Sequence, residues 1–365
     1  MLFLDNFRNK TVLVTGHTGF KGSWLCLWLK NLGANIVGLG LDPTSDKSFY
    51  SVNNINLFVE DNIFDIRDLN KVKNLISTVK PDFVFHLAAQ ALVRKSYLDP
   101  LETYSTNVEG TLNVLESLRT LNNKCACVFI TSDKCYENNE WVWGYRETDR
   151  LGGSDPYSSS KACAELSIKS YFDSFFKNEE SVVKISSARA GNVIGGGDWS
   201  EDRIVPDCIR AWSKGETVRL RSPLSTRPWQ HVLEPLSGYL LLASNLYMDE
   251  NLNGNSFNFG PNESKNHSVK ELVEMMGEYW EKVKWEDISD TKKKLYESGL
   301  LRLNCDKASA LLKWESTLKF EETVRFTVEW YKEFYEKNGN IQKKSSSQIE
   351  DYVKFAKKVN QNWIT

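Results

Sequence analysis

The chain has 365 residues, enough for two or three domains, and its 41% hydrophobic and 26% charged residues are ordinary for a globular protein. Its 46 Lys and Arg nearly balance 48 Asp and Glu, so no net field would attract nucleic acid or an anionic membrane. Seven Cys without a C-x-x-C pair and four His without an H-x-x-x-H pair argue against a metal site, and we expect none.

The sequence also bears on where the protein works. The first ten residues, MLFLDNFRNK, lack the apolar stretch of a signal peptide, and no run approaches membrane-spanning length. An odd number of cysteines in a chain of this size indicates reduced thiols. We therefore expect a cytoplasmic protein whose partners include neither a membrane nor nucleic acid.

The first half of the chain alternates strand and helix signals. The segments TVLVTG, NIVGLGL, PDFVFHLAA, CACVFI and SVVKISSARAG are short apolar runs typical of strands. Between them, GSWLCLWLKNLG (closed by Gly33), NVEGTLNVLESLRTL and YSSSKACAELSIKSYFDSFF have the character of helices. Buried strands separated by helices predict an α/β fold with a doubly wound parallel sheet of the Rossmann type.

The pattern loosens after Asn192. TVRLRSPL and NSFNFG indicate short strands, and helices dominate from Ser268 onward. This pattern predicts a second, smaller mixed α/β domain at the carboxyl edge of the sheet. NGNIQKKSSS is a polar connector, and the last helix is predicted to begin with a capping box from Ser347 to Glu350.

A glycine loop, TGHTGFKG, follows the first strand and opens a helix. Such glycines let the backbone approach a pyrophosphate, which the positive end of the helix dipole then faces. Asp42 ends the second strand about 20 residues later, where a carboxylate would bind the adenosine ribose and repel a 2′-phosphate. The alternative for Asp42 is a turn residue before Pro43. The pattern predicts NAD as the cofactor, bound by the loop residues Gly16, His17, Thr18, Gly19, Phe20, Lys21 and Gly22.

The G-x-x-G-x-x-G spacing of this loop resembles the extended branch of the short-chain dehydrogenase/reductase family. DIRD (65–68) resembles the adenine-binding stretch after that family's third strand, and HLAAQ (86–90) resembles the loop beside the nicotinamide ribose. We interpret His86 as a strand histidine rather than a catalyst. The resemblance implies further cofactor-binding residues: Asp65, Ile66, Leu87, Ala88, Ala89, Gln90, Thr106, Tyr157 and Lys161.

The segment YSSSK places Tyr157 and Lys161 one helical turn apart on the same face. A tyrosine titrates near pH ~10, and a neighbouring cation favours its phenolate. Directly after CACVFI comes TSDKCY, at the edge of the sheet where ligands bind in doubly wound folds. The resemblance implies that Ser132 hydrogen-bonds a sugar hydroxyl and that Tyr157 deprotonates it.

A simple reductase or epimerase of this family does not need the side chains of Asp133 and Lys134. Sugar nucleotide 4,6-dehydratases carry an extra acid and base at this place, and TSDKCY resembles the cytidine-linked members. The resemblance implies that CDP-glucose is oxidised at C4, loses water across C5 and C6, and regains the hydride at C6. Asp133 would be the acid, with a pKa raised by burial, and Lys134 either the base or a stabiliser of the enolate. The alternative is a surface ion pair in a loop.

Three later segments, RAGNVIGGGDW, EDRIVPD and STRPWQHVLEP, resemble the family regions that meet the sugar nucleotide. Arginines suit phosphates because the guanidinium group is planar and always charged. Each of these side chains also has a purely structural alternative. The substrate-binding residues that we expect are Gln90, Asn192, Arg203, Arg227, Gln230 and His231.

The resemblance implies a division into parts. We expect an NAD-binding domain over residues 1–190 with a returning segment at about 229–262, a sugar-nucleotide-binding domain over 191–228 and 263–340, and a tail helix over 341–365.

Relatives dimerise through the helices after strands four and five, here about 103–119 and 157–175. Both segments carry apolar residues on more than one face, which is compatible with such an interface. We therefore expect a homodimer or homotetramer held by a four-helix bundle.

Two other functions are left open by the sequence. A sugar nucleotide 4-epimerase on the same fold would use Ser132, Tyr157 and Lys161 but leave Asp133 and Lys134 without a role. A non-catalytic NAD-binding regulator would need none of these side chains.

Overall fold

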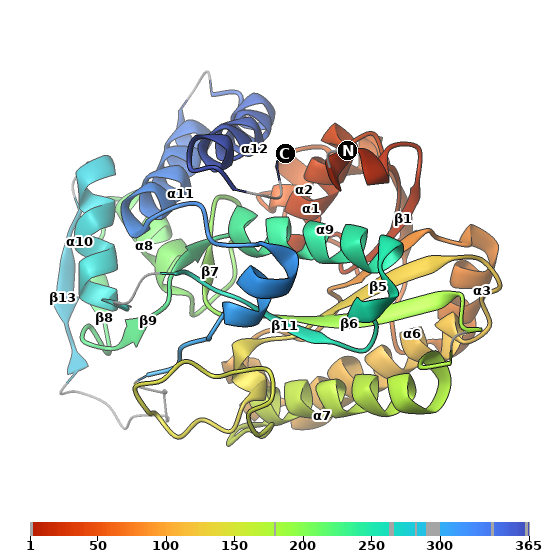
Figure 1. Cartoon of the computed structure of the whole chain (residues 1–365). Helices are drawn as coiled ribbons and strands as arrows, with labels where there is room; N and C mark the ends of the chain where they lie inside the picture. Colours follow the sequence, from red (N-terminus) through yellow and green to blue (C-terminus); the bar gives the residue numbers. More distant parts are fainter. Residues whose placement is uncertain are drawn as a thin grey trace.

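The computed structural model describes residues 3–178, 180–262, 266–281, 283–289, 300–336, 339–361 and 364. Within these ranges, seven parallel strands form a central sheet in the order β3-β2-β1-β4-β5-β6-β11 (Figure 1). The predicted doubly wound α/β fold is therefore confirmed, with its switch point between β1 and β4. The strands are β1 (Thr11–Thr15), β2 (Asn35–Gly40), β3 (Val59–Ile63), β4 (Phe83–His86), β5 (Cys125–Ile130), β6 (Val183–Ala190) and β11 (Ser256–Phe259).

Both faces of this sheet are buried, which explains the continuous apolar runs in the sequence. In β1, Val12 and Val14 join the hydrophobic core on one face, and Leu13 joins the core on the other. In β5, Val128 and Phe129 divide between the two cores in the same way. A parallel sheet needs such two-sided burial because its crossover helices cover both faces.

One face is covered by α3 (Leu69–Val79), α6 (Gly110–Leu118) and α7 (Pro156–Tyr171), and the other by α1 (Phe20–Asn31) and α9 (Leu233–Met248) (Figure 1). Local signals set their ends. The side chain of Asp155 accepts a hydrogen bond from Ser158 N, with Pro156 at the first helical position. Gly33 follows α1 with a φ of 77°, the left-handed conformation of a helix C-terminus.

Shorter elements connect these layers. A continuous helical stretch runs through α5 (Pro100–Tyr104), a π-helical turn η3 (Ser105–Glu109) and α6, and α7 also ends in a π-helical turn, η5 (Phe172–Phe176). The remaining short helices and turns before residue 260 are η1 (Phe3–Phe7), α2 (Phe49–Val52), η2 (Ile55–Leu57), α4 (Val93–Leu98), η4 (Asp133–Cys135) and η6 (Glu250–Leu252).

A second group of elements lies at one end of the sheet (Figure 1). It contains three small strand pairs, β7–β10, β8–β13 and β9–β12, while α9 and β11 return to the large sheet. Its members are β7 (Val193–Ile194), α8 (Ile204–Trp212), β8 (Val218–Leu220), β9 (Thr226–Arg227), β10 (Gln230–His231), β12 (His267–Ser268), α10 (Val269–Tyr279), β13 (Trp285–Asp287), η8 (Ala308–Leu312) and α11 (Phe320–Tyr335).

The last helix, α12 (Ile341–Lys358), begins earlier than the sequence indicated. The expected capping box at Ser347 is wrong, because Asn340 caps the helix and its side chain accepts a hydrogen bond from Lys343 N. The predicted polar connector is helical because its Ser345 is buried and accepts a hydrogen bond from Trp330 Nε1 at 2.8 Å. Packing against α11 therefore decided the conformation of a weakly helical stretch.

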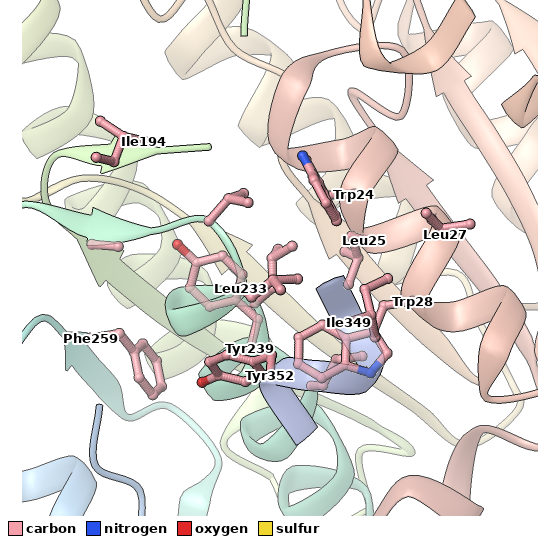
Figure 2. Packing of buried hydrophobic residues seen from close by; sticks show 14 of the residues in the cluster. Trp24, Leu25, Leu27, Trp28, Ile194, Leu233, Tyr239, Phe259, Ile349 and Tyr352 are labelled. Carbon is pink, nitrogen blue, oxygen red and sulfur yellow. The ribbon is translucent and has the colours of Figure 1, made fainter. Parts of the chain in front are cut away.

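The α12 helix docks against both α1 and α9. Figure 2 shows Ile349 and Tyr352 of α12 beside Trp28, with the Trp28 and Tyr352 ring centroids 5.6 Å apart. The Tyr352 hydroxyl donates to Glu234 Oε2 and contacts Ser237 Oγ, each at 3.0 Å. Burial raises the pKa of Glu234 to about 7. This polar cluster lies inside the core and links α12 to α9, while the ring contact with Trp28 links α12 to α1.

We predict that Tyr352→Phe lowers the free energy of unfolding by about 1–3 kcal/mol, because it leaves the buried Glu234 carboxyl without one donor. Urea denaturation measures this change, with Tyr335→Phe at the partly exposed end of α11 as the control. Equal effects of the two substitutions would contradict this role for Tyr352.

Candidate active site

The glycine loop after β1 forms a close-packed cradle at the carboxyl edge of the sheet. Gly16 has a φ of 76°, and a Cβ on it would lie 2.8 Å from Ala88 N in the loop after β4. A Cβ on Gly22 would lie 2.1 Å from Gly16 O. A larger residue at position 16 would push the two loops apart, and one at position 22 would displace the glycine loop from the first turn of α1. The structure thus brings together the loop residues and the segment 87–90 that the sequence assigned to the cofactor.

The geometry of this cradle fits a dinucleotide. The N-cap of α1 is Gly19, which has no side chain to bond the first-turn amides, so these N–H groups remain available to a pyrophosphate. Thr18 Oγ1 donates to Leu41 O at 2.8 Å, which fixes the loop after β2. Asp42 is the next residue and is exposed beside this contact, as a ligand of a ribose would have to be. Phe20 begins α1, and its ring lies near Gly195.

His17 is oriented differently from the rest of the loop. Its buried ring lies over Gly38 of β2, where a Cβ would approach the ring to 2.3 Å. Its Nε2 is 2.9 Å from Asp61 Oδ1 on β3, and Tyr50 also donates to that carboxylate. The His17 side chain therefore supports the cradle from behind, and its backbone forms part of the loop.

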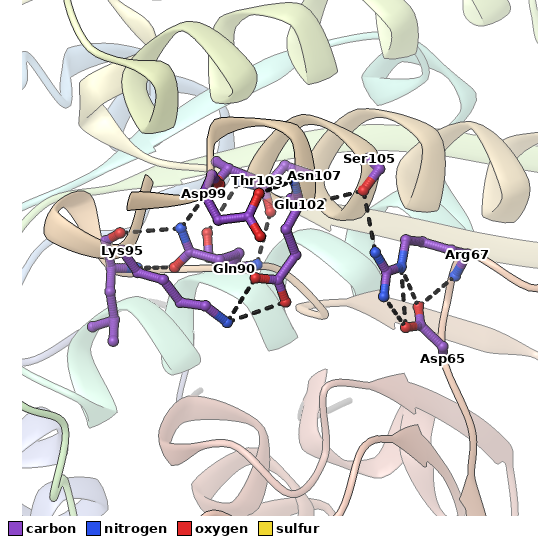
Figure 3. Close-up of polar contacts among 10 residues, drawn as sticks. Asp65, Arg67, Gln90, Lys95, Asp99, Glu102, Thr103, Ser105 and Asn107 are labelled. Atoms are coloured by element: carbon purple, nitrogen blue, oxygen red, sulfur yellow. Dashed lines mark hydrogen bonds and ion pairs between the residues drawn. The ribbon is translucent and has the colours of Figure 1, made fainter. Parts of the chain in front are cut away.

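Asp65 and Ile66 follow β3 but differ in their surroundings. Asp65 Oδ2 accepts from Arg67 Nη2 at 2.6 Å, and that bond is the main cause that holds its pKa below the ordinary value (Figure 3). Ile66 is buried, and its carbonyl accepts from Asn113 Nδ2 at 3.1 Å. Its backbone is thus held against α6, next to the half-exposed carboxylate of Asp65.

The Gln90 side chain is used within the protein (Figure 3). Its Nε2 donates to Thr103 Oγ1 at 2.9 Å, and its Oε1 accepts from Leu92 N at 2.6 Å. Asn107 in the π-helical turn η3 binds both backbone groups of Gln90, and its Nδ2 also donates to Ser160 Oγ at 2.8 Å. The sequence pointed to the neighbouring Thr106, which is half-buried, and gave no signal for Asn107.

Ser132, Asp133 and Lys134 leave the end of β5 in a short 3-10 turn. Ser132 Oγ donates to Asp133 Oδ1 at 2.9 Å, and Lys134 N donates to Ser132 Oγ at 3.3 Å. Asp133 is 4% exposed, and burial raises its pKa against the opposing effect of Lys134. The expected rise in pKa is confirmed, and the carboxyl is buried rather than part of a surface ion pair.

Tyr157 and Lys161 lie on the face of α7 that meets this turn. Burial raises the pKa of Tyr157 to about 12, although a hydrogen bond with Ser132 and the charge of Arg203 lower it. Burial lowers the pKa of Lys161 to about 8. The sequence led us to expect a lowered pKa for Tyr157, and this is wrong in the protein alone because the desolvation of the phenolate outweighs the nearby cations.

Lys21 also extends toward this cluster, beyond its expected place in the glycine loop. Burial is the largest cause that lowers its pKa to about 8, followed by the positive charge of Arg203, while Asp133 acts in the opposite direction. Lys21 and Lys134 thus act on a single buried carboxyl, while Arg203 and Lys161 act on Lys21. Such a concentration of positive charge suits phosphates and a developing enolate.

Two arginines and an amide come from the second group of elements. Arg203 precedes α8, and its Nη1 pairs with Asp198 Oδ2 at 2.8 Å. Asn192 is half-buried and follows Gly191, at which a Cβ would lie 3.0 Å from Asp133 Oδ2. Arg227 lies on β9, where its Nη1 donates to Thr226 O. Gly191 therefore lies directly against Asp133 in the turn of residues 132–134.

His231 lies deeper than a substrate contact requires, whereas Gln230 is buried but lines a pocket. Gln230 Nε2 donates to Phe259 O at 3.1 Å. The fully buried His231 ring packs edge-on against Trp24 and Phe326, and burial lowers its pKa to about 3. A neutral imidazole in this core supports the wall of the site, so the structure places His231 behind the substrate region.

A small pocket of about 10 Å³ lies beside the segment that contacts Asp133. Gly191 belongs both to this pocket and to the contact with Asp133. Arg302 lines it as well, and the sequence gave no signal for this residue because no motif spacing marks it. The lining residues are Gly191, Pro228, Gln230, Gly260, Pro261, Asn266, Arg302 and Leu303.

In the described part of the chain, no group of three or more His, Cys, Asp and Glu side chains could hold a metal ion. Among the described helices, none combines the length and apolarity needed to cross a membrane.

Comparison with known proteins agrees with this geometry. The family model of GDP-mannose 4,6 dehydratase matches residues 13–327. The CDP-glucose 4,6-dehydratase of Salmonella typhimurium is 45% identical over 357 residues, which are 97% of this chain and 99% of that protein.

Solved structures share the fold. The UDP-glucose 4-epimerase of Thermotoga maritima, solved with UDP-glucose, has a TM-score of 0.76 at 24% identity, over 89% of this chain and 100% of that one. The UDP-glucuronic acid 4-epimerase of Bacillus cereus, solved with UDP-glucuronic acid and NAD, has a TM-score of 0.76 at 22% identity with the same coverage of 89% and 100%. Together, the family model, the relative from Salmonella typhimurium and the fold show that the chain belongs to the GDP-mannose 4,6-dehydratase family.

Proposed function

We propose that this protein is an NAD-dependent CDP-glucose 4,6-dehydratase, which converts CDP-D-glucose to CDP-4-dehydro-6-deoxy-D-glucose and water. The observation that carries the proposal is the buried Asp133 carboxyl, hydrogen-bonded to Ser132 beside Tyr157. An epimerase would have no use for that acid. The similarity to the Salmonella typhimurium enzyme, which extends over nearly the whole of both chains, supports the choice of substrate.

The glycine cradle, Asp42 and the backbone of residues 65–66 and 87–90 would hold NAD, with the α1 N-terminus facing its pyrophosphate. The chemistry that bound NAD supplies is the removal of hydride from C4 of the sugar and its later return to C6. The nicotinamide is also a cation, which would add to the effects of Ser132 and Arg203 on the Tyr157 phenol.

In the oxidation step, Tyr157 takes the proton of the sugar O4 hydroxyl while Ser132 holds that oxygen by a hydrogen bond. Lys161, one turn further along α7, provides the ammonium that favours the phenolate. The resulting ketone acidifies the proton on C5.

In the elimination step, Lys134 removes the C5 proton or stabilises the enolate that forms, and Asp133 protonates the departing C6 hydroxyl so that it leaves as water. Burial raises the pKa of the Asp133 carboxyl, which favours the protonated form that this role requires. Lys134 is half-buried directly beside it.

For the substrate, we assign Asn192, Arg203 and Arg227 to the sugar nucleotide, with the arginines on its diphosphate. Gln90 and His231 would shape this site without direct side-chain contacts, since the Gln90 amide is bonded within the protein and the His231 ring is fully buried. Gln230 lines the pocket and would contact the sugar nucleotide there. The proposed division is residues 1–190 with 229–262 for NAD, and 191–228 with 263–340 for the sugar nucleotide.

We also propose that the reaction takes place in the cytoplasm. Each of the seven cysteines, all within the described ranges, is a free thiol, as expected in a reducing compartment.

The substrate proposal is tested by supplying purified protein and NAD with CDP-, UDP-, GDP- and dTDP-glucose and measuring a 4-keto-6-deoxy sugar by NMR. We expect efficient turnover of CDP-glucose alone. An epimerised sugar would favour an epimerase, and no turnover of any of the four would favour a non-catalytic NAD-binding regulator.

We predict that Asp133→Asn retains NAD binding and the first oxidation but lowers the rate of water loss by about 10²–10⁴-fold, because the amide cannot protonate the leaving hydroxyl. Reduced nicotinamide should then accumulate on the enzyme, which absorbance detects directly. Asp351→Asn on the surface of α12 is the control. Unchanged product formation would remove Asp133 from the acid role.

We predict a homodimer formed through α5, α6 and α7. Leu101 on α5 is 81% exposed and Leu166 on α7 is 57% exposed, which is costly for large apolar side chains without a partner. The double variant Leu101→Glu/Leu166→Glu should sediment as a monomer, whereas Leu57→Glu, at an exposed leucine of η2, should not. A wild-type monomer, or a variant that remains dimeric, would contradict this interface.

A further inference from the structure

A buried ion pair behind the catalytic turn has no role in the reaction described above. Glu165 on α7 and Arg189 on β6 are 2% and 3% exposed, and Arg189 Nη2 lies 2.7 Å from Glu165 Oε2. Such pairs contribute little net stability, because the cost of removing two charges from water offsets their attraction. Stability alone therefore does not explain why this pair lies in the core.

The first clue to its role is the position of Glu165 on α7. Tyr157, Lys161 and Glu165 follow one another at intervals of four residues, so all three share one face of the helix. Burial lowers the pKa of Lys161, and Glu165 is the main group that acts in the opposite direction. The charge of Glu165 therefore helps Lys161 to remain an ammonium.

The second clue is that the pair binds both ends of the catalytic turn. Thr131 Oγ1 donates to Glu165 Oε1 just before the turn, and Arg189 Nη1 donates to Tyr136 Oη at 2.7 Å just after it. The Tyr136 hydroxyl in turn donates to Asn258 Oδ1 at 2.8 Å. Ser132, Asp133 and Lys134 lie between these two fixed points.

Further bonds hold the pair itself in place. Ser187 Oγ donates to Glu165 Oε2 at 2.9 Å, and Arg189 Nη1 donates to Glu147 O at 3.1 Å. Arg189 Nη2 also donates to Ser256 Oγ at 3.2 Å. The planar fork of Arg189 is thus shared among α7, β11 and the turn, which a lysine could not reproduce.

We propose that Glu165 and Arg189 are positioning residues, which hold the segment 131–136 in its reactive geometry. This inference rests on the proposed function, because it assigns to the pair a task in that reaction. The segment that carries the catalytic groups would then be held by two core elements, α7 and β6, and not only by its own contacts.

The charge of Lys161 depends on groups from several elements, and the pH profile has to be interpreted with all of them in view. The Lys161 ammonium is present below a pH of about 8 and is lost as the pH rises through that value. Loss of the Glu165 charge lowers this pKa further, so the alkaline limb of activity moves toward neutral pH. The titratable groups that interact with Lys161 are Glu165, Cys135, Lys21 and His86.

The test compares Glu165→Gln and Arg189→Lys with wild type as NAD-loaded enzymes. For Glu165→Gln, we expect kcat to fall at least about tenfold with KM changed less than about threefold, and the alkaline limb to move down by about half a pH unit or more. Arg189→Lys keeps the charge but loses the fork, so kcat should fall without the shift in pH.

Ser187→Ala is the matched control, because it removes one donor to the Glu165 carboxylate but preserves the charge and both fixed points of the turn. Its kcat should stay within about twofold of wild type. If Glu165→Gln fails to fold, Glu165→Gln/Arg189→Met, which leaves no uncompensated charge, replaces it in the comparison.

Two results together would overturn the proposal. They are kcat and KM of the Glu165 variant within about twofold of wild type, and an alkaline limb within about 0.2 pH units of wild type. Inactivity of the wild-type enzyme would instead defeat the proposed function. In that case, crystal structures of wild type and the variant test the positioning role separately. We expect Ser132 and Asp133 to be displaced by about 1 Å in the variant, and unchanged positions would refute the role.

Discussion

The desolvation of one carboxyl group organises this protein. Strand β5 ends inside the molecule, and its next residues place Asp133 under the loop that begins at Gly191. Water would keep this side chain ionised, and its exclusion raises the pKa of the acid. The same exclusion lowers the pKa of the amines of Lys21 and Lys161. A single physical cause thus brings the pKa values of one carboxyl and two amines closer to neutral pH.

The fold supplies this dry environment by closing two groups of elements over the carboxyl edge of a parallel sheet. Gly16 lets the first loop lie directly against the loop after β4, and Gly22 lets the first turn of α1 pack against Gly16, so that a dinucleotide can be bound by backbone. On the far side, α12 ties α1 to α9 through Tyr352 and Glu234. The helix lies beyond residues 13–327, which the family model covers.

The sequence was informative wherever local chemistry dictates the structure. Neighbouring residues alone determine the apolar strands, the glycine loop and the four-residue step from Tyr157 to Lys161. These patterns therefore predict the fold and show that the main residues of the site lie close together. Continuing that step by one more turn would have found Glu165. The sequence could not show that Gln90 is bonded to Thr103 or that His231 lies in the core, because both depend on contacts between distant segments. The start of α12 was missed for the same reason, since burial of Ser345 against Trp330 overrides weak local propensity.

The central claim is that this site removes water from a sugar while the abstracted hydride is kept and returned within one active site. The most direct measurement supplies CDP-glucose that carries deuterium at C4 and locates the label in the product by NMR and mass spectrometry. The account predicts deuterium in the methyl group at C6, transferred within a single sugar molecule, and a solvent-derived proton at C5. Loss of the label to solvent, or its retention at C4 of an epimerised sugar, would contradict it.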